Sequence, residues 1–335
     1  MKKIAIIGGG LSGLYAATLL ETHYEVSLFE ARERLGGRIH TIEGFDLGPS
    51  WVWAHQNRIL KLIRSLGLEI IPQYEKGQAL YETPGAVERF TPQPTAPSGR
   101  IKGGIGRVID RLRESLASTA IHVGEPIHSV SKTDDGVNVH SERGVYRFDE
   151  VIITLPPRLI IETLHINPTL PSEVQTKFMG ISTWMGHSAK CVIEFESPFW
   201  REMGLSGFCF SHAGPMGEIH DACIEGRYAL FGFINANANM ETIEEDVRHQ
   251  CRHLFGNAGE NILNFYCVDW RKEPFTAVAK DAIAPRSHPN YGVKAEHFGG
   301  KLHFIGTETS FEDGGYLEGS IESVERLLQA LDNSR

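Results

Sequence analysis

The chain has few cysteines and no paired metal-binding motif. Its five cysteines form no C-x-x-C pair and are odd in number. This excludes a disulfide framework and a zinc ribbon, and it predicts reduced, mostly buried thiols in a cytoplasmic protein. The fifteen histidines include no H-E-x-x-H or comparable ligand spacing. We therefore predict no metal site, and interpret His212, His220 and Asp221 as polar loop residues rather than ligands.

Long hydrophobic runs and basic clusters are also missing. No apolar run approaches membrane-spanning length, and the first predicted strand begins at residue 3, so we expect neither a membrane span nor a signal peptide. The net charge of −9, without a lysine or arginine run, argues against nucleic acid and anionic membranes as partners. The 335 residues contain no internal repeat and suggest two domains, while the oligomeric state stays open.

The N-terminal segment contains the parts of a dinucleotide-binding unit in the required order. An apolar strand is predicted over 3–7, the sequence at 8–13 fits G-x-G-x-x-G and leads into a helical pattern, and a strand over 25–30 ends on an acid. A glycine motif alone is also typical of turns that bind nothing. The flanking strand, helix and acid favour a phosphate-bearing dinucleotide over such a turn.

Each residue of this motif has a mechanical role. Gly8 permits the tight turn, Gly10 lets the backbone approach a pyrophosphate, and Gly13 lets the helix pack close to the strand. The helix N-terminus offers unpaired N–H groups and a positive dipole to the phosphates. Glu30 is placed to accept a hydrogen bond from an adenosine ribose hydroxyl and to repel a 2′-phosphate, which disfavours NADP.

Two further glycine-containing segments suit an extended cofactor. Gly36 and Gly37 precede Arg38, which suits a backbone that passes close to the cofactor and a guanidinium able to reach phosphate. Near the C-terminus a strand over 302–305 runs into a glycine, and the sequence at 314–319 opens a second helix. This second strand–glycine–helix terminus is suited to the flavin end of a dinucleotide, so we predict a bound flavin.

The remaining pattern predicts an α/β fold. Periodicity indicates helices over 57–66, 105–116 and 241–255, strands over 151–155, 189–195, 228–233 and 263–270, and a small antiparallel unit with turns at 134–136 and 142–144. Four prolines between 83 and 99 indicate a loop or a short extended insert.

We predict a Rossmann-like FAD-binding domain, made of a parallel sheet plus a small antiparallel sheet, with an inserted α+β substrate domain. The character of the chain changes after residue 180 and returns to the opening style near the C-terminus. The FAD-binding domain then comprises residues 1–79, 101–180 and 273–335, and the substrate domain comprises 80–100 and 181–272.

Together these segments resemble the flavin-containing amine oxidase family, which includes monoamine and polyamine oxidases, in a short form. The resemblance covers both ends and the middle, and is poor only over 83–100 and 202–265. The motifs that carry it are Gly8–Gly13, Glu30, Gly36-Gly37-Arg38, Asp46-Leu47-Gly48, Gln56-Asn57-Arg58, Met185–Lys190, Pro198-Phe199-Trp200-Arg201, Gly306-Thr307-Glu308 and Gly315–Gly319.

The resemblance implies FAD as the cofactor. The attachment cysteine of covalently flavinylated members has no match in 275–280, so the FAD should be non-covalent. The expected cofactor-binding residues are Gly8, Gly10, Leu11, Ser12, Gly13, Glu30, Ala31, Arg32, Gly36, Gly37, Arg38, Gly48, Ser50, Trp51, Ile127, Trp270, Gly306, Thr307, Glu308, Gly315, Tyr316 and Leu317.

The resemblance also implies two catalytic residues. Lys190 matches a lysine that holds a water near the flavin N5, and its alternative is an ordinary strand lysine that points to solvent. Tyr316 matches an aromatic residue that flanks the amine, and its alternative is a core tyrosine at a helix start.

This sequence departs from the family pattern at three places. Pro49 stands where the family usually repeats glycine, so the loop near the flavin ring differs. The second aromatic of the substrate cage has no match, and Phe275, Trp184 or Trp53 could supply the missing wall. The proline-rich segment replaces a larger helical part, which predicts a more open site, suited to a larger substrate or completed by another subunit.

The implied reaction is amine oxidation. A hydride would pass from the α-carbon of a neutral amine to flavin N5, water would hydrolyse the imine, and O2 would be reduced to H2O2. The alternatives are an FAD-dependent C–C desaturase or porphyrinogen-type oxidase, and a flavoprotein that binds FAD without turnover. A plain NAD dehydrogenase would leave the second glycine–helix terminus unexplained.

Overall fold

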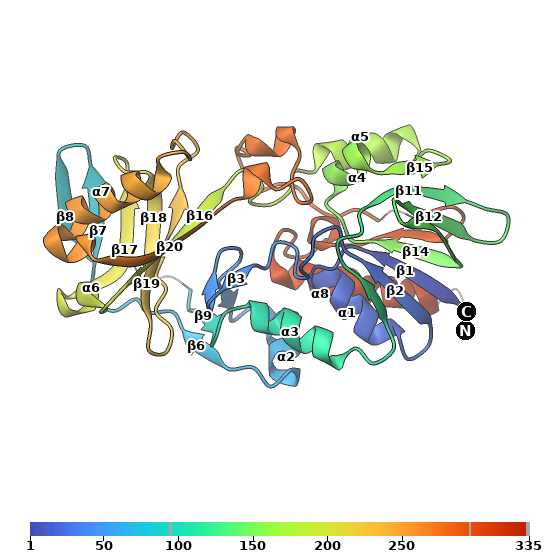
Figure 1. The fold of residues 1–335 in the computed structure, drawn as a ribbon, viewed down its shortest axis with the longest axis horizontal. Coiled ribbons are helices and arrows are strands. Elements are labelled where there is room, and N and C mark those ends of the chain that lie inside the picture. Colours follow the sequence, from blue (N-terminus) through green and yellow to red (C-terminus); the bar gives the residue numbers. More distant parts are fainter. Residues whose placement is uncertain (94–95, 295, 333–335) are drawn as a thin grey trace.

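Two large sheets occupy opposite ends of the molecule (Figure 1). The computed structural model describes residues 1–93, 96–294 and 296–332. The first sheet, in strand order, consists of β10 (Ala120–His122), β2 (Glu25–Phe29), β1 (Lys3–Ile7), β14 (Glu150–Ile153), β22 (Leu302–Phe304) and β21 (Glu296–His297). The second consists of β20 (Ile262–Asp269), β16 (Ala189–Phe195), β19 (Tyr228–Ile234), β18 (Met216–Asp221), β17 (Leu205–Ser211), β7 (Gln78–Thr83) and β8 (Ala86–Phe90).

The first sheet is parallel at its centre and covered on both faces. Strand β1 pairs in parallel with β2 and β14, and β14 pairs in parallel with β22. Ile4 and Ile6 pack on one face with the core of the helices, whereas Ala5 and Ile7 pack on the other face with the small sheet. Burial of both faces explains why β1 is a continuous apolar run rather than an alternating one.

The covering layers lie above and below this sheet in Figure 1. On one side is a sheet of β13 (Gly144–Phe148), β12 (Val137–Ser141), β11 (Ile127–Lys132) and β15 (His165–Asn167), with α4 (Pro157–Thr163) and α5 (Ser172–Gly180). On the other side are α1 (Leu11–Leu20), α2 (Asn57–Ser65), α3 (Gly106–Ser115) and α8 (Leu317–Asp332). The predicted parallel sheet with a small antiparallel sheet is therefore confirmed.

The remaining elements are the short strands β3 (Thr41–Ile42), β4 (Phe45–Asp46), β5 (Val52–Trp53), β6 (Ile70–Pro72) and β9 (Ser98–Ile101), the helices α6 (Phe199–Glu202) and α7 (Ile243–Phe255), and 3-10 helices at Gly256–Glu260, Trp270–Lys272, Ala279–Ala282 and Thr307–Thr309. The apolar face of α7 packs on one face of the seven-stranded sheet. Strand β16 is buried along its whole length, because Val192 packs with Phe45 and Leu47 on the other face. The three helices predicted from periodicity match α2, α3 and α7, and both predicted turns join adjacent strands.

The prediction for the proline-rich segment is wrong in part. Residues 78–90 form a hairpin that joins the seven-stranded sheet through β17, with Pro84 and Gly85 in its turn, and β9 pairs with β5 and β6. Pro84 lies in the turn, and Pro92 and Pro97 lie between strands, where their missing N–H costs no ladder bond. Pro94 and Thr95 lie outside the described residues. The boundaries of the two predicted domains stay a prediction.

The cysteines are as predicted, whereas two of the three residues His212, His220 and Asp221 lie in a strand. All five cysteines are free, four of them buried, as predicted. His220 and Asp221 lie in β18 rather than in a loop, and the buried Asp221 accepts hydrogen bonds from Arg201 and Trp200. In the described part of the chain no cluster of His, Cys, Asp and Glu could hold a metal ion. No helix there is long and apolar enough to cross a bilayer.

Candidate active site

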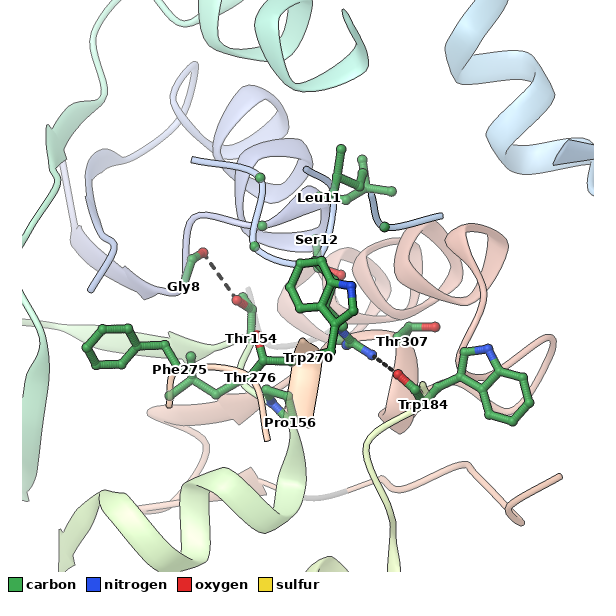
Figure 2. A pocket seen from close by; sticks show the side chains of 18 of the residues that line it. Gly8, Leu11, Ser12, Thr154, Pro156, Trp184, Trp270, Phe275, Thr276 and Thr307 are labelled. Carbon is green, nitrogen blue, oxygen red and sulfur yellow. Dashed lines mark hydrogen bonds between the residues drawn. The ribbon is translucent and has the colours of Figure 1, made fainter. Parts of the chain in front are cut away.

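A large cavity, part of whose lining is drawn in Figure 2, is lined by residues of both halves of the molecule. Its volume is about 770 Å³, within the usual range for sites that enclose a small-molecule ligand. The walls come from the glycine-rich turn after β1, the loops after β2 and β14, strands β16, β18 and β19, and the start of α8.

Most residues predicted to bind the cofactor line this cavity. They are Gly8, Gly10, Leu11, Ser12, Glu30, Ala31, Arg32, Gly36, Gly37, Arg38, Gly48, Ser50, Trp51, Ile127, Trp270, Gly306, Thr307, Gly315, Tyr316 and Leu317. The exceptions are Gly13 and Glu308, which do not line the cavity, and their part in cofactor binding stays a prediction. A Cβ on Gly13 would lie 1.9 Å from the Gly8 carbonyl oxygen, so this glycine serves helix–strand packing.

The backbone around the first turn fits a dinucleotide. A Cβ on Gly10 would meet only the Gly36 carbonyl oxygen at 3.8 Å, and one on Gly37 would meet only Gly10 Cα at 3.5 Å. Space is therefore left for a ligand to reach the main chain. Helix α1 begins after Gly10 without a side-chain cap, so its first N–H groups are available to an anion such as a pyrophosphate.

Glu30 is held in place by the backbone at this end of the cavity. It is 4 % exposed. Its two carboxylate oxygens accept hydrogen bonds from Gly9 N at 2.8 Å and Arg32 N at 2.9 Å. The Arg32 guanidinium donates to Glu273 and Thr276, and lies 5.6 Å from the Phe275 ring. The carboxylate is thus oriented before any ligand binds.

A Glu30→Gln variant tests the placement of this carboxylate. We expect the FAD dissociation constant to rise roughly tenfold or more, because a charge-assisted hydrogen bond contributes about 1.5–3 kcal/mol and an amide cannot accept at both of its polar atoms. Quenching of flavin fluorescence on titration of the apoprotein gives the constant. The exposed neighbour Glu33 supplies the control, since Glu33→Gln should leave the constant unchanged. Equal affinities for all three proteins would contradict the placement.

Arg38 has a partner within the protein. Its guanidinium donates to both oxygens of the buried Glu308 carboxylate, at 2.5 and 2.9 Å, and to the Trp184 carbonyl oxygen at 3.4 Å. A bidentate pair with a buried carboxylate fixes the guanidinium, and its reach to a phosphate stays a prediction. Arg38 lines the cavity while joining three segments that are far apart in the sequence.

Lys190 is buried, which rules out the solvent-facing alternative. It is 2 % exposed, and its Nζ donates to Ser50 Oγ at 2.5 Å and to the Gly48 carbonyl oxygen at 3.0 Å. The Phe231 ring lies 4.0 Å from Nζ. Burial lowers the pKa of Lys190 to about 7, although the nearby Asp46 carboxylate raises it. A lysine that titrates near neutral pH in a cavity is typical of a functional residue.

Aromatic rings surround Tyr316 at the same end. The ring centroids of Trp53 and Trp184 both lie 5.8 Å from that of Tyr316, and His288 stacks on it at 5.6 Å. Both tryptophans line the cavity, and their part in the missing cage wall stays a prediction. Phe275 lies beside Arg32 and is not part of this group.

Sequence reasoning missed several lining residues. They are Ile7, Phe29, Ile39, Leu47, Glu125, Pro126, His128, Thr154, Leu155, Pro156, Leu159, Thr163, Met185, Ser188, Glu218, Phe233, Pro274, Thr276 and Ser320. The sequence predicts a strand over 151–155, which Pro156 and Pro157 follow. Because ligands bind beyond the carboxyl ends of parallel strands, Thr154 to Pro156 could have been predicted as lining residues. Glu218 and Phe233 lie opposite each other on β18 and β19, and no motif marks them.

Comparison with known proteins agrees with this geometry. The model of the family described as flavin containing amine oxidoreductase matches residues 11–99 and 89–326. Amine oxidase [flavin-containing] A of Bos taurus is 24% identical over 454 residues, which cover 100% of this chain and 85% of the relative. Since this alignment is longer than the chain, the relative carries segments that the chain lacks.

Two solved structures share the fold. A putrescine oxidase bound to putrescine has a TM-score of 0.82 at 20% identity, covering 100% of this chain and 99% of its own. Cyclohexylamine oxidase from Brevibacterium oxydans has a TM-score of 0.83 at 19% identity, covering 99% of both chains. The family match spans most of the sequence, and the cavity offers a dinucleotide a glycine-lined backbone and an uncapped helix. The chain therefore belongs to the flavin-containing amine oxidoreductase family, and it is a flavin-dependent oxidoreductase with FAD as its cofactor.

Proposed function

We propose that this protein oxidises a small amine with O2 as the electron acceptor. The observation that carries the proposal is Lys190, which is buried in the wall of the same cavity as the aromatic group of Trp53, Trp184 and Tyr316. When bound, FAD accepts a hydride equivalent from the substrate and passes two electrons to O2, which gives H2O2. We propose the roles of the individual cavity residues together with this reaction.

The chain's own residues would bind, orient and shield the substrate. The N-terminal turn, Glu30 and the Gly306–Thr307 backbone would hold FAD, and no cysteine among the described lining residues could attach it covalently. The three aromatic rings would fix the reacting carbon and exclude water. Lys190 would hold a water by hydrogen bonding and, while protonated, would stabilise negative charge that develops on O2.

One carboxylate on the cavity wall, that of Glu218, favours amines over amino acids. Three described carboxylates line the cavity, and Glu30 and Glu125 are bound by backbone or side-chain donors. Glu218 lies on the same sheet as Lys190 and is partly open to solvent, and its Oε1 lies 2.6 Å from His220 Nε2. A carboxylate there would attract a second ammonium group of a diamine and repel a substrate carboxylate.

Anaerobic mixing of the holoenzyme with monoamines, diamines and amino acids, followed by flavin absorbance, tests the proposal. We expect amines to bleach the flavin, with diamines reacting at lower concentration than monoamines of equal length and amino acids inert. Dithionite bleaching is the control that the flavin can be reduced. A flavin that dithionite bleaches but no amine bleaches would contradict the proposal and favour a desaturase, a porphyrinogen-type oxidase or a non-catalytic flavoprotein. Bleaching by amino acids alone would overturn the preference for amines.

A further inference from the structure

A second cavity shares one wall residue, Ser50, with the large one. Its volume is about 10 Å³, the space that one water molecule needs. Asp46, Ser50 and Arg100 provide its polar wall, and its other lining residues are glycine or apolar. Lys190 donates to Ser50 Oγ, so this hydroxyl joins the proposed catalytic lysine to the small cavity.

Arg100 lines this cavity and carries an unpaired donor. Its side chain is buried, with the whole residue 7 % exposed. One terminal nitrogen donates to the Cys223 carbonyl oxygen at 2.7 Å and lies 3.8 Å from the Asp221 carboxylate. Among the described residues, Nε has no hydrogen-bond partner. A buried unpaired donor costs about 1–3 kcal/mol, so an acceptor in the cavity would be strongly favoured.

Asp46 contributes a buried carboxylate whose pKa is raised. It is 8 % exposed, and its Oδ1 accepts hydrogen bonds from Thr41 Oγ1 at 2.5 Å and Ile105 N at 2.9 Å. Burial raises the pKa of Asp46 to about 6, although the Thr41 hydrogen bond and the Lys190 charge lower it. Burial thus favours the uncharged form of both Asp46 and Lys190, while each charge favours the charged form of the other.

We propose that one buried water in this cavity, hydrogen-bonded to Arg100 Nε, Asp46 and Ser50, links Asp46 to Lys190 and lets Asp46 set the protonation state of that lysine. The proposal rests on the role of Lys190 given above. The ammonium proton of Lys190 passes to Ser50 Oγ, the serine proton passes to the water, and a water proton passes to the Asp46 carboxylate. A neutral amine and a neutral acid result, so the net charge of the buried group is unchanged.

The charged groups around Lys190 determine whether each substitution raises or lowers the pKa of this lysine. Asp46 favours the protonated form of Lys190, Arg100 opposes it, and the adjacent Cys191 thiol has a pKa that burial raises well above its usual value. Arg100 itself faces Asp221, Arg201 and Cys223, and Glu218 faces the large cavity. Asp46, Ser50 and Arg100 are positioning residues, because they act through Lys190.

The first test is the pH dependence of flavin reoxidation, which requires no amine and is therefore independent of the substrate assignment. The holoenzyme is reduced with stoichiometric dithionite and mixed with O2. We expect the wild-type rate to fall as pH rises and Lys190 loses its proton. Asp46→Asn should move this fall to lower pH by about one unit or more, whereas Arg100→Gln should move it to higher pH.

The matched control is a buried carboxylate that does not line the small cavity. Glu82 is another buried carboxylate of the seven-stranded sheet, bound to Ser211 and Gln250, and Glu82→Gln should leave the profile unchanged. Flavin content and melting temperature establish that each variant folds. Unmoved profiles, or shifts of Asp46→Asn and Arg100→Gln in the same direction, would overturn the proposal.

The second test is independent of rate. A crystal structure of the holoenzyme at near-atomic resolution should show a water within hydrogen-bond distance of Arg100 Nε, an Asp46 oxygen and Ser50 Oγ. A dry cavity, or Arg100 Nε bonded to a protein acceptor, overturns the proposal even if the profiles move, since charge alone would then explain them.

Discussion

Replacing Lys190 with methionine is expected to slow reoxidation of the reduced flavin by O2 by about 100-fold or more, while FAD stays bound. The buried ammonium lies in the cavity wall, where a low dielectric strengthens its interaction with charge that develops on O2. Methionine fills a similar volume, so the wall keeps its shape. Stopped-flow mixing of reduced protein with O2 measures the rate directly.

Lys132 supplies the matched control, because it is an exposed lysine at the end of β11. Lys132→Met should reoxidise at the wild-type rate. If Lys190→Met also does so, Lys190 has no part in the reaction with O2. A loss of flavin from Lys190→Met would instead assign the lysine to cofactor binding.

The same variant should change the pH dependence of stability. Burial lowers the pKa of Lys190 from 10.5 to about 7, so between these values the unfolded chain binds more protons than the folded one. Burying the Lys190 ammonium therefore lowers the free energy of unfolding by its full amount below pH 7. This cost shrinks as the pH rises from about 7 to 10.5, so the stability of the wild type rises over that range. The difference in melting temperature between Lys190→Met and the wild type should be largest below pH 7, with the variant higher, and should shrink above it.

Replacing Gly13 with alanine is expected to destabilise the protein by about 3 kcal/mol and to weaken FAD binding by about 100-fold. The added Cβ would lie 1.9 Å from the Gly8 carbonyl oxygen and 3.1 Å from its carbon. These are backbone atoms of the turn after β1, so helix α1 must move away from the strand. The helix N-terminus then no longer faces the space left open beside Gly10.

Thermal unfolding and flavin fluorescence titration measure the two losses, and the melting temperature should fall by roughly 4 °C. Gly85 supplies the control, since no atom lies within 4 Å of a Cβ placed there. Gly85→Ala should leave both quantities near wild type. A Gly13→Ala protein with normal FAD affinity would show that the close approach of helix and strand is not needed for binding.

The sequence was sufficient where one short segment determines the geometry. Gly8, Gly10 and Gly36 could be placed at the cavity because a positive φ or a close backbone approach limits the choice of residue. Amphipathic periodicity likewise located α2, α3 and α7. Strand β1 was recognisable because burial on both faces leaves a continuous apolar run.

Long-range pairing was the part that could not be predicted. Arg38 lies 270 positions from Glu308 in the sequence, and nothing local distinguishes a guanidinium that binds a buried carboxylate from one that binds phosphate. The hairpin of β7 and β8 is stabilised by its contact with β17, so its own proline-rich surroundings suggested a loop. Glu218 reaches the cavity through the register of β18 and β19, which no spacing in the sequence reveals.

The cavity wall is built from both ends of the chain, which the ion pair between Arg38 and Glu308 joins, and this has a consequence for biosynthesis. During translation the N-terminal turn leaves the ribosome long before Gly306, Thr307 and the start of α8, which complete the cavity wall. A nascent chain can therefore present only half of the cofactor's surroundings. Cofactor capture is then a step that follows synthesis, and the newly made apoprotein must persist with this cavity filled by solvent until FAD arrives.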